Sequence, residues 1–219
     1  MTHHLTVEVV DADRAIREAQ ASVDGSTSRA GFFKKSFAAG GGLVLGGVAI
    51  GGLPALGTAA PGPAQDAEIL QFALLLEYLE AEFYTQASRG GALRGEARTF
   101  SRVVGGHERA HVAFLKKALG SKAQASPTFD FKGTTEDQAK FQATAVLLED
   151  TGVAAYNGQG PNLTKKTLAA AGSIVSVEAR HAAWIRDIVG KNPAPNAFDP
   201  AKTKAQILAA VKSTGFITA

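Results

Sequence analysis

The sequence predicts an all-α protein: an antiparallel four-helix bundle with a long crossover between its second and third helices, and a short C-terminal helix. Three observations support this prediction. Apolar residues recur at helical spacing in four long segments between Asp66 and Val189. Glycine or proline follows each segment, where helices usually stop. The links within the first pair and within the last pair of segments are short, whereas the middle link is long, as in bundles with one crossover connection.

The predicted helices can be bounded from their end signals. The four long helices are expected over about residues 66–88, 96–119, 135–156 and 163–189, and the short one over about 200–212. The third begins at Thr135, which forms a capping-box pattern with Gln138, and it is expected to continue to about Tyr156 and to break over residues 158–161. The short helix is expected to begin at Asp199 and Pro200, a favourable pair for an N-cap and a first helical position.

Two features between the second and third helices bear on packing. Gly105 and Gly106 lie inside the second predicted helix and mark either a local distortion or a close approach of another helix. Residues 120–134 contain Pro127 and lack helical spacing. This stretch is long for a bundle loop, and it is long enough to cross from one helix pair to the other.

The first sixty residues differ in character from the rest. The stretch Ser28–Lys35 (SRAGFFKK) is basic and is followed by an apolar, glycine-rich run over 37–56 and by small residues over 57–62. These are the marks of an export signal, and the pattern resembles a twin-arginine signal in which Ala30 replaces the second arginine. A membrane anchor is the alternative, because the run has about the length of a minimal spanning helix. The chain therefore divides into an N-terminal segment (1–60), the bundle (61–195) and a helical tail (196–219).

Two Glu-x-x-His motifs lie on predicted helices, each preceded by another glutamate in the previous helix. The six residues are Glu77, Glu108 and His111 in the first half, and Glu149, Glu178 and His181 in the second. Residues three apart on a helix share a face, so each motif presents a carboxylate beside an imidazole. Four carboxylates and two imidazoles from four helices are the set with which a four-helix bundle holds two metal ions.

The order of these residues amounts to an internal duplication. Each half has a Leu-Leu-Glu sequence, ending at Glu77 or Glu149, and a tyrosine seven residues later. The helical neighbours of the four glutamates are mostly apolar, which places the carboxylates in stripes that face the core. Burying unpaired carboxylates is costly, and two divalent cations would cancel their charge. The alternative is that these glutamates are exposed or form ion pairs with Arg109 and Arg180.

Composition excludes several other classes of protein. The chain has no cysteine, which excludes thiolate ligands, disulfides and thiol nucleophiles. The net charge of +3 is small, and no basic stripe with interleaved aromatics indicates nucleic-acid binding. Carboxylate and imidazole donors suit iron or manganese better than copper electron-transfer or structural zinc sites.

Together, the segment 66–84, the two Glu-x-x-His motifs and the segment 148–156 resemble the ferritin-like superfamily. They are most similar to its exported ferritin-like-domain proteins, which include plant and fungal desiccation-related proteins. The resemblance implies a ferritin-like bundle in which the six residues are di-metal ligands. It also places Tyr84 and Tyr156 at positions that often hold an aromatic near the metals, so they are candidate catalytic residues.

The expected function follows from this ligand set. Glu108 and Glu178 would be shared by two iron or manganese ions, and Glu80 is an alternative to Glu77 as a terminal ligand. His107 lies off the ligand face and is expected at the surface or behind the ligands. The leading hypothesis is oxidation of iron(II), or consumption of peroxide, by a monomer or homodimer in the cell envelope or periplasm. The alternatives are a non-catalytic protective bundle for dehydration stress and a dimanganese catalase.

Overall fold

The computed structural model describes residues 61–218, and within this range the chain is built from helices. The export signal or anchor predicted within residues 1–60 lies outside the described residues. Five α-helices and two 3₁₀ turns follow one another in the order α4 (Pro63–Gly90), α5 (Gly95–Leu119), η1 (Gly120–Lys122), α6 (Gln138–Gln159), η2 (Gly160–Asn162), α7 (Lys165–Ile188) and α8 (Lys204–Thr214). The predicted all-α fold with four long helices and one short C-terminal helix is confirmed.

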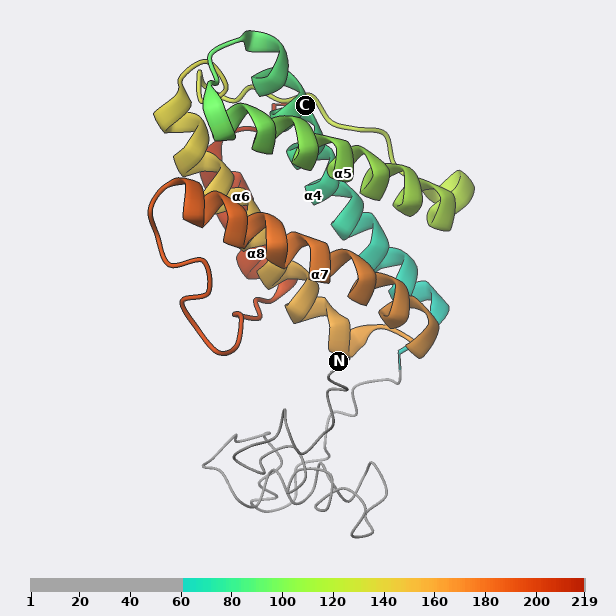
Figure 1. Cartoon of the computed structure of the whole chain (residues 1–219). Coiled ribbons are helices and arrows are strands. Elements are labelled where there is room, and N and C mark those ends of the chain that lie inside the picture. The colour runs from blue at the N-terminus through green and yellow to red at the C-terminus, as the bar shows by residue number, and fades with distance from the viewer. Residues whose placement is uncertain (1–60, 219) are drawn as a thin grey trace, which may run out of the picture. The chain divides into compact units, whose positions relative to one another are not determined.

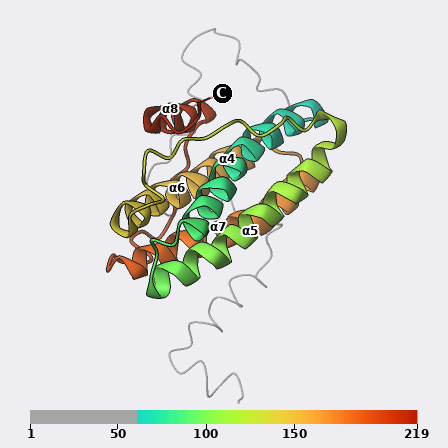
Figure 2. The same ribbon diagram turned by 90° about the horizontal axis from the view of Figure 1, so that it is seen from above.

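The helices form two antiparallel pairs, α4 with α5 and α6 with α7 (Figure 1). The crossover between α5 and α6 runs back alongside α4 (Figure 2). Its backbone pairs with the C-terminal segment: the Asp130 N–H donates to the Phe216 carbonyl at 2.8 Å, and the Thr218 N–H donates to the Thr128 carbonyl at 3.0 Å. The long irregular connection is therefore held by the end of the chain.

Two predicted helix starts are wrong. The N-cap of α6 is Asp137, whose side chain accepts a hydrogen bond from the Lys140 N–H at 2.8 Å, whereas Thr135 is already buried in the preceding turn. The N-cap of α8 is Thr203, which forms a reciprocal capping box with Gln206. The predicted start at 199–200 is wrong because the reciprocal bonds between Thr203 and Gln206 fix the first turn of the helix after Thr203.

Helix α6 ends at Gln159, within the stretch 158–161 where the break was predicted, and it runs through Gly158. A Cβ at position 158 would lie only 1.8 Å from the carbonyl oxygen of Lys202. The Lys202 N–H donates to the Ala154 carbonyl at 3.0 Å. The glycine therefore allows the segment before α8 to lie directly on α6.

Gly105 in α5 marks a close helix approach, one of the two alternatives that the sequence left open. A Cβ at this position would lie 2.8 Å from the Cβ of Tyr84 in α4. This contact brings α5 against α4 one turn before the Glu108 motif. Helix α5 remains a single α-helix from Gly95 to Leu119.

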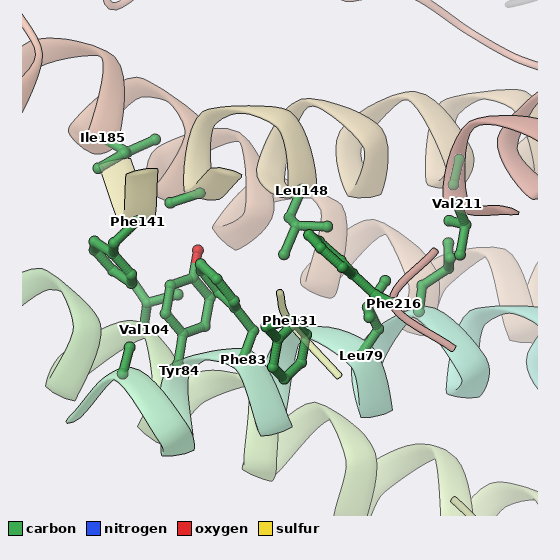
Figure 3. Close-up of a cluster of buried hydrophobic side chains, with 14 of the residues drawn as sticks. Leu79, Phe83, Tyr84, Val104, Phe131, Phe141, Leu148, Ile185, Val211 and Phe216 are labelled. Atoms are coloured by element: carbon green, nitrogen blue, oxygen red, sulfur yellow. The ribbon is translucent and has the colours of Figure 1, made fainter. Parts of the chain in front are cut away.

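Aromatic side chains fill the core beside this contact (Figure 3). The rings of Phe83 and Phe141 stack with centroids 5.2 Å apart, and Tyr84 meets Phe100 edge to face at 5.7 Å. These four side chains are fully buried. Aromatic pairs of this kind add to the stability gained from burial alone, so the ends of α4, α5 and α6 nearest this cluster are firmly positioned.

Candidate metal centre

The six residues predicted as metal ligands come together in the interior of the bundle. They form two overlapping groups, within each of which the ligand atoms lie within 4.8 Å of one another: Glu77, Glu108, His111 and Glu178, and Glu108, Glu149, Glu178 and His181. Glu108 and Glu178 belong to both groups. The chain therefore has a cluster of carboxylate and histidine side chains that could bind metal, with two residues shared between two positions.

The cluster is dry. Glu108, Glu149 and Glu178 have no exposed surface, and Glu77 is 1% exposed. The side chain of His181 is 4% exposed and that of His111 is 12% exposed. The alternative in which these glutamates are exposed or pair with Arg109 and Arg180 is wrong, because both arginines lie at the surface.

Each imidazole is surrounded by several carboxylate oxygens. Nδ1 of His111 lies 3.1 Å from Glu108, 3.1 Å from Glu178 and 3.2 Å from Glu77. Nδ1 of His181 lies 3.1 Å from Glu108 and 3.3 Å from Glu149. One N–H can point well at only one acceptor, so hydrogen bonding does not account for the convergence of these atoms.

Several buried polar atoms in the cluster have no hydrogen-bond partner within the described range. They are Oε1 of Glu108, Oε2 of Glu149, both carboxylate oxygens of Glu178 and Nδ1 of His181. Unpaired buried polar groups are rare in folded proteins because each costs free energy. Oxygen and nitrogen atoms of this kind, facing one another, fit a pair of cations.

The pKa values follow from burial and from the contacts between the groups. Burial raises the pKa of Glu77 to about 8. Burial also acts on Glu108, but the close contacts with the His111 and His181 imidazoles outweigh it and lower the pKa of that carboxyl to about 2. The surrounding carboxylates overcome burial at both histidines and raise the pKa of His111 to about 12 and that of His181 to about 10. Without metal, two imidazolium ions therefore balance part of the carboxylate charge.

Two tyrosines hold the terminal carboxylates in a crosswise arrangement. The hydroxyl of Tyr84 in α4 donates to Oε1 of Glu149 in α6. The hydroxyl of Tyr156 in α6 donates to Oε1 of Glu77 in α4 at 2.5 Å. The predicted tyrosines therefore lie against carboxylates of the cluster, each contributed by the opposite helix pair.

Neighbours of the six residues take different positions. His107 is exposed at the surface, and its Nδ1 lies 2.8 Å from Nε2 of His181, so one imidazole donates to the other. This bond leaves Nδ1 of His181 facing the carboxylates, as outer hydrogen bonds commonly orient a ligating histidine. Glu77, and not Glu80, belongs to the two groups of clustered ligand atoms, although both carboxyl groups are buried. Glu80 therefore lies in the interior in addition to the six, whereas the sequence indicated it only as an alternative to Glu77.

Comparison with known proteins gives one family. A model described as a ferritin-like domain matches residues 65–191, more than half of the chain. The matched range begins in the first turn of α4 and ends just after α7, and so contains all six clustered residues. A search of curated proteins gave no significant match.

Proposed function

The chain belongs to the ferritin-like domain family, and from this premise we propose that it binds two iron or manganese ions and uses them to oxidise iron(II) or to consume peroxide. The observation that carries the proposal is the group of buried, unpartnered ligand atoms at the centre of the bundle. Four carboxylates and two imidazoles match the charge and the donor preference of two divalent first-row ions.

The position of each residue in the cluster indicates which ion it would hold. Glu77 and His111 would hold one ion, and Glu149 and His181 the other, with Glu108 and Glu178 shared. When bound, a redox-active metal pair supplies electrons to dioxygen or peroxide. The protein's part is to keep water out of the site and to fix the donors before the ions arrive.

The tyrosine hydroxyls are proposed to orient the carboxylates of Glu149 and Glu77 by donating a hydrogen bond to one oxygen of each. The hydroxyl of Tyr84 keeps one oxygen of Glu149 occupied, so the other oxygen, Oε2, faces His181 and the cluster. Tyr156 acts in the same way on Glu77, leaving its Oε2 toward His111. Each terminal carboxylate therefore presents one defined oxygen to the metal position.

Metal loading tests the proposal directly. Protein loaded anaerobically with iron(II) should take up about two ions per chain and then consume dioxygen or peroxide. The double variant Glu108→Ala with His111→Ala should lose both properties, whereas Glu68→Ala, an exposed change on α4, should keep them. Equal metal content in the double variant and the parent would refute the proposal.

Other outcomes distinguish the alternatives. A protein that binds no metal and consumes no oxidant would be a non-catalytic bundle, as proposed for a protective role in the desiccation-related branch. Rapid release of dioxygen from peroxide by manganese-loaded protein would identify a dimanganese catalase. Iron(II) oxidation without that release supports the leading proposal.

We also propose that the protein acts outside the cytoplasm as a monomer or homodimer. The basic stretch 28–35, the apolar run 37–56 and the small residues that follow support an export signal. No helix within residues 61–218 has the length and apolar character needed to cross a membrane. N-terminal sequencing of the protein from cell fractions tests the proposal: export predicts a new terminus near residues 58–60, and an uncut chain in the membrane fraction indicates an anchor.

A further inference from the structure

Glu80 is a fifth carboxylate in the interior of the bundle, beyond the four that belong to the two ligand groups. It lies on α4 one turn after Glu77, and only 3% of its surface is exposed. None of the ion pairs formed within residues 61–218 includes it. A buried carboxylate without a cationic partner is costly, so its position calls for an explanation.

The register of the helices places Glu80 at the middle of the cluster. The bonds from Tyr84 to Glu149 and from Tyr156 to Glu77 show that α4 and α6 run antiparallel with these residues level. Glu80 is about midway between Glu77 and Tyr84. It therefore faces the middle of the segment between Glu149 and Tyr156, between the two terminal carboxylates.

The residue opposite Glu80 is Gly152, which occupies the corresponding position of the second half. Each lies three residues after the glutamate of its Leu-Leu-Glu sequence. A Cβ at position 152 would lie 3.3 Å from Oε1 of Glu80 and 3.1 Å from Oε2 of Glu178. Both distances are tighter than ordinary contacts, so a side chain at position 152 would push these two carboxylate oxygens away from the positions they hold beside the glycine.

Both oxygens of Glu178 are buried without a hydrogen-bond partner, and Oε2 is the oxygen that faces this space. Glu178 also belongs to both ligand groups. Two buried carboxylates that adjoin the same space repel each other unless a cation or a proton lies between them. No hydrogen bond joins Glu80 to Glu178 within residues 61–218, and a cation at the centre would lie within reach of both.

We propose that Glu80 is a seventh metal-facing side chain of the centre and that Gly152 is the positioning residue that makes space for it; the inference rests on the proposed function. With Glu80 the cluster carries five carboxylates, one more than two divalent ions neutralise. The centre is therefore suited to a pair of ions with more than four positive charges, which means at least one trivalent ion. The single glutamate also makes the two halves of the site chemically different.

The test compares a trivalent with a divalent probe. Terbium(III), detected by luminescence sensitised by the nearby tyrosines, and cobalt(II), detected by its visible absorption, are titrated into the parent and into Glu80→Gln. Terbium affinity should fall about tenfold or more, the scale of losing a group that supports a metal site, and cobalt affinity should fall less. Glu68→Gln, an exposed change of the same type on α4, should change neither.

Gly152→Ala provides a second variant that keeps every carboxylate. Its methyl group enters the space between Glu80 and Glu178 and should also weaken terbium binding. Gly172→Ala in α7, where no atom lies within 4 Å of the added methyl group, should not. In the metal-free protein Glu80→Gln should leave the melting temperature unchanged, because the amide keeps the size of the carboxyl group, and a lower melting temperature would indicate a structural role instead.

The results separate this inference from the proposed function. If the parent binds neither probe, the proposed function fails. If the parent binds both and Glu80→Gln binds terbium within twofold of the parent, the role of Glu80 is refuted while the metal centre stands.

Discussion

Removing metal should reverse the way in which the stability of the protein depends on pH. In the metal-free protein the pKa values of His111 and His181 are raised to about 12 and about 10, and that of Glu77 to about 8. In the unfolded chain these groups titrate near 6.5 and 4.5. The folded state therefore holds more protons than the unfolded state between pH 5 and 8, and stability must fall as pH rises through that window.

The size of the effect follows from the number of protons. For each additional proton held by the folded state, the free energy of unfolding falls by about 1.4 kcal/mol per pH unit as pH rises. Because the three groups share one cluster and titrate together, we count one to two protons, which gives roughly 1.4–2.8 kcal/mol per pH unit. In a domain of this size 1 kcal/mol corresponds to about 2–4 °C, so the melting temperature should fall by roughly 3–10 °C per pH unit.

Glu108 contributes with the opposite sign at low pH. Its pKa in the folded protein is lowered to about 2, so its contribution to stability is present above about pH 4.5 and is lost as pH falls toward 2. The metal-free protein should therefore be most stable near pH 5, between the two effects.

Metal changes the sign of the slope. Binding requires deprotonated ligands, so the stabilisation by metal grows as pH rises. At a free concentration one hundred times the dissociation constant, each ion adds about 2.7 kcal/mol, and two ions raise the melting temperature by roughly 10–20 °C. Calorimetric melts from pH 5 to 8, with chelator or with manganese(II), measure both slopes. A metal-free melting temperature that rises with pH, or identical slopes in both series, would refute the reasoning.

Three substitutions test the supports of the centre. Tyr84→Phe leaves an oxygen of Glu149 without its donor and should lower stability by about 1–2 kcal/mol and metal affinity about tenfold; unchanged values in melts and titrations would exclude the positioning role. The methyl group of Gly105→Ala would lie 2.8 Å from the Tyr84 Cβ, so this variant should be less stable by about 1–3 kcal/mol, although alanine is the better helix former. Denaturant titration measures the change, and a gain in stability would show that α5 can shift freely. Asp66→Ala removes the acceptor of the backbone N–H at the N-cap of α7 and should cost about 1–3 kcal/mol, measured by thermal melts, with no loss of metal stoichiometry.

The cluster of carboxylates and histidines could be predicted from the sequence because helical periodicity determines which side chains share a face. Residues three apart share a face in any α-helix, so the formation of α5 is enough to place Glu108 and His111 side by side. The apolar neighbours of Glu77 and Glu149 placed them toward the core in the same way. The long crossover then followed from the lack of helical spacing in residues 120–134.

Other features were missed because two local signals competed or because the signal lies in a distant segment. The starts of α6 and α8 carry local signals, the Asp137 cap and the Thr203–Gln206 capping box, but nearby polar residues offered competing N-caps. Gly158 correctly indicated that α6 ends nearby, but nothing in the sequence indicated that it also admits the backbone of Lys202. The interior position of Glu80 depends on Gly152 across the bundle, which no pattern within α4 reveals.

The crosswise tyrosine bonds have a consequence for how the centre is assembled. Because each helix pair supplies the hydroxyl that orients the other pair's terminal glutamate, neither α4–α5 nor α6–α7 can prepare half a site by itself. Competence to capture metal should therefore appear only when the two hairpins dock, late in folding, and a bound ion would report that docking.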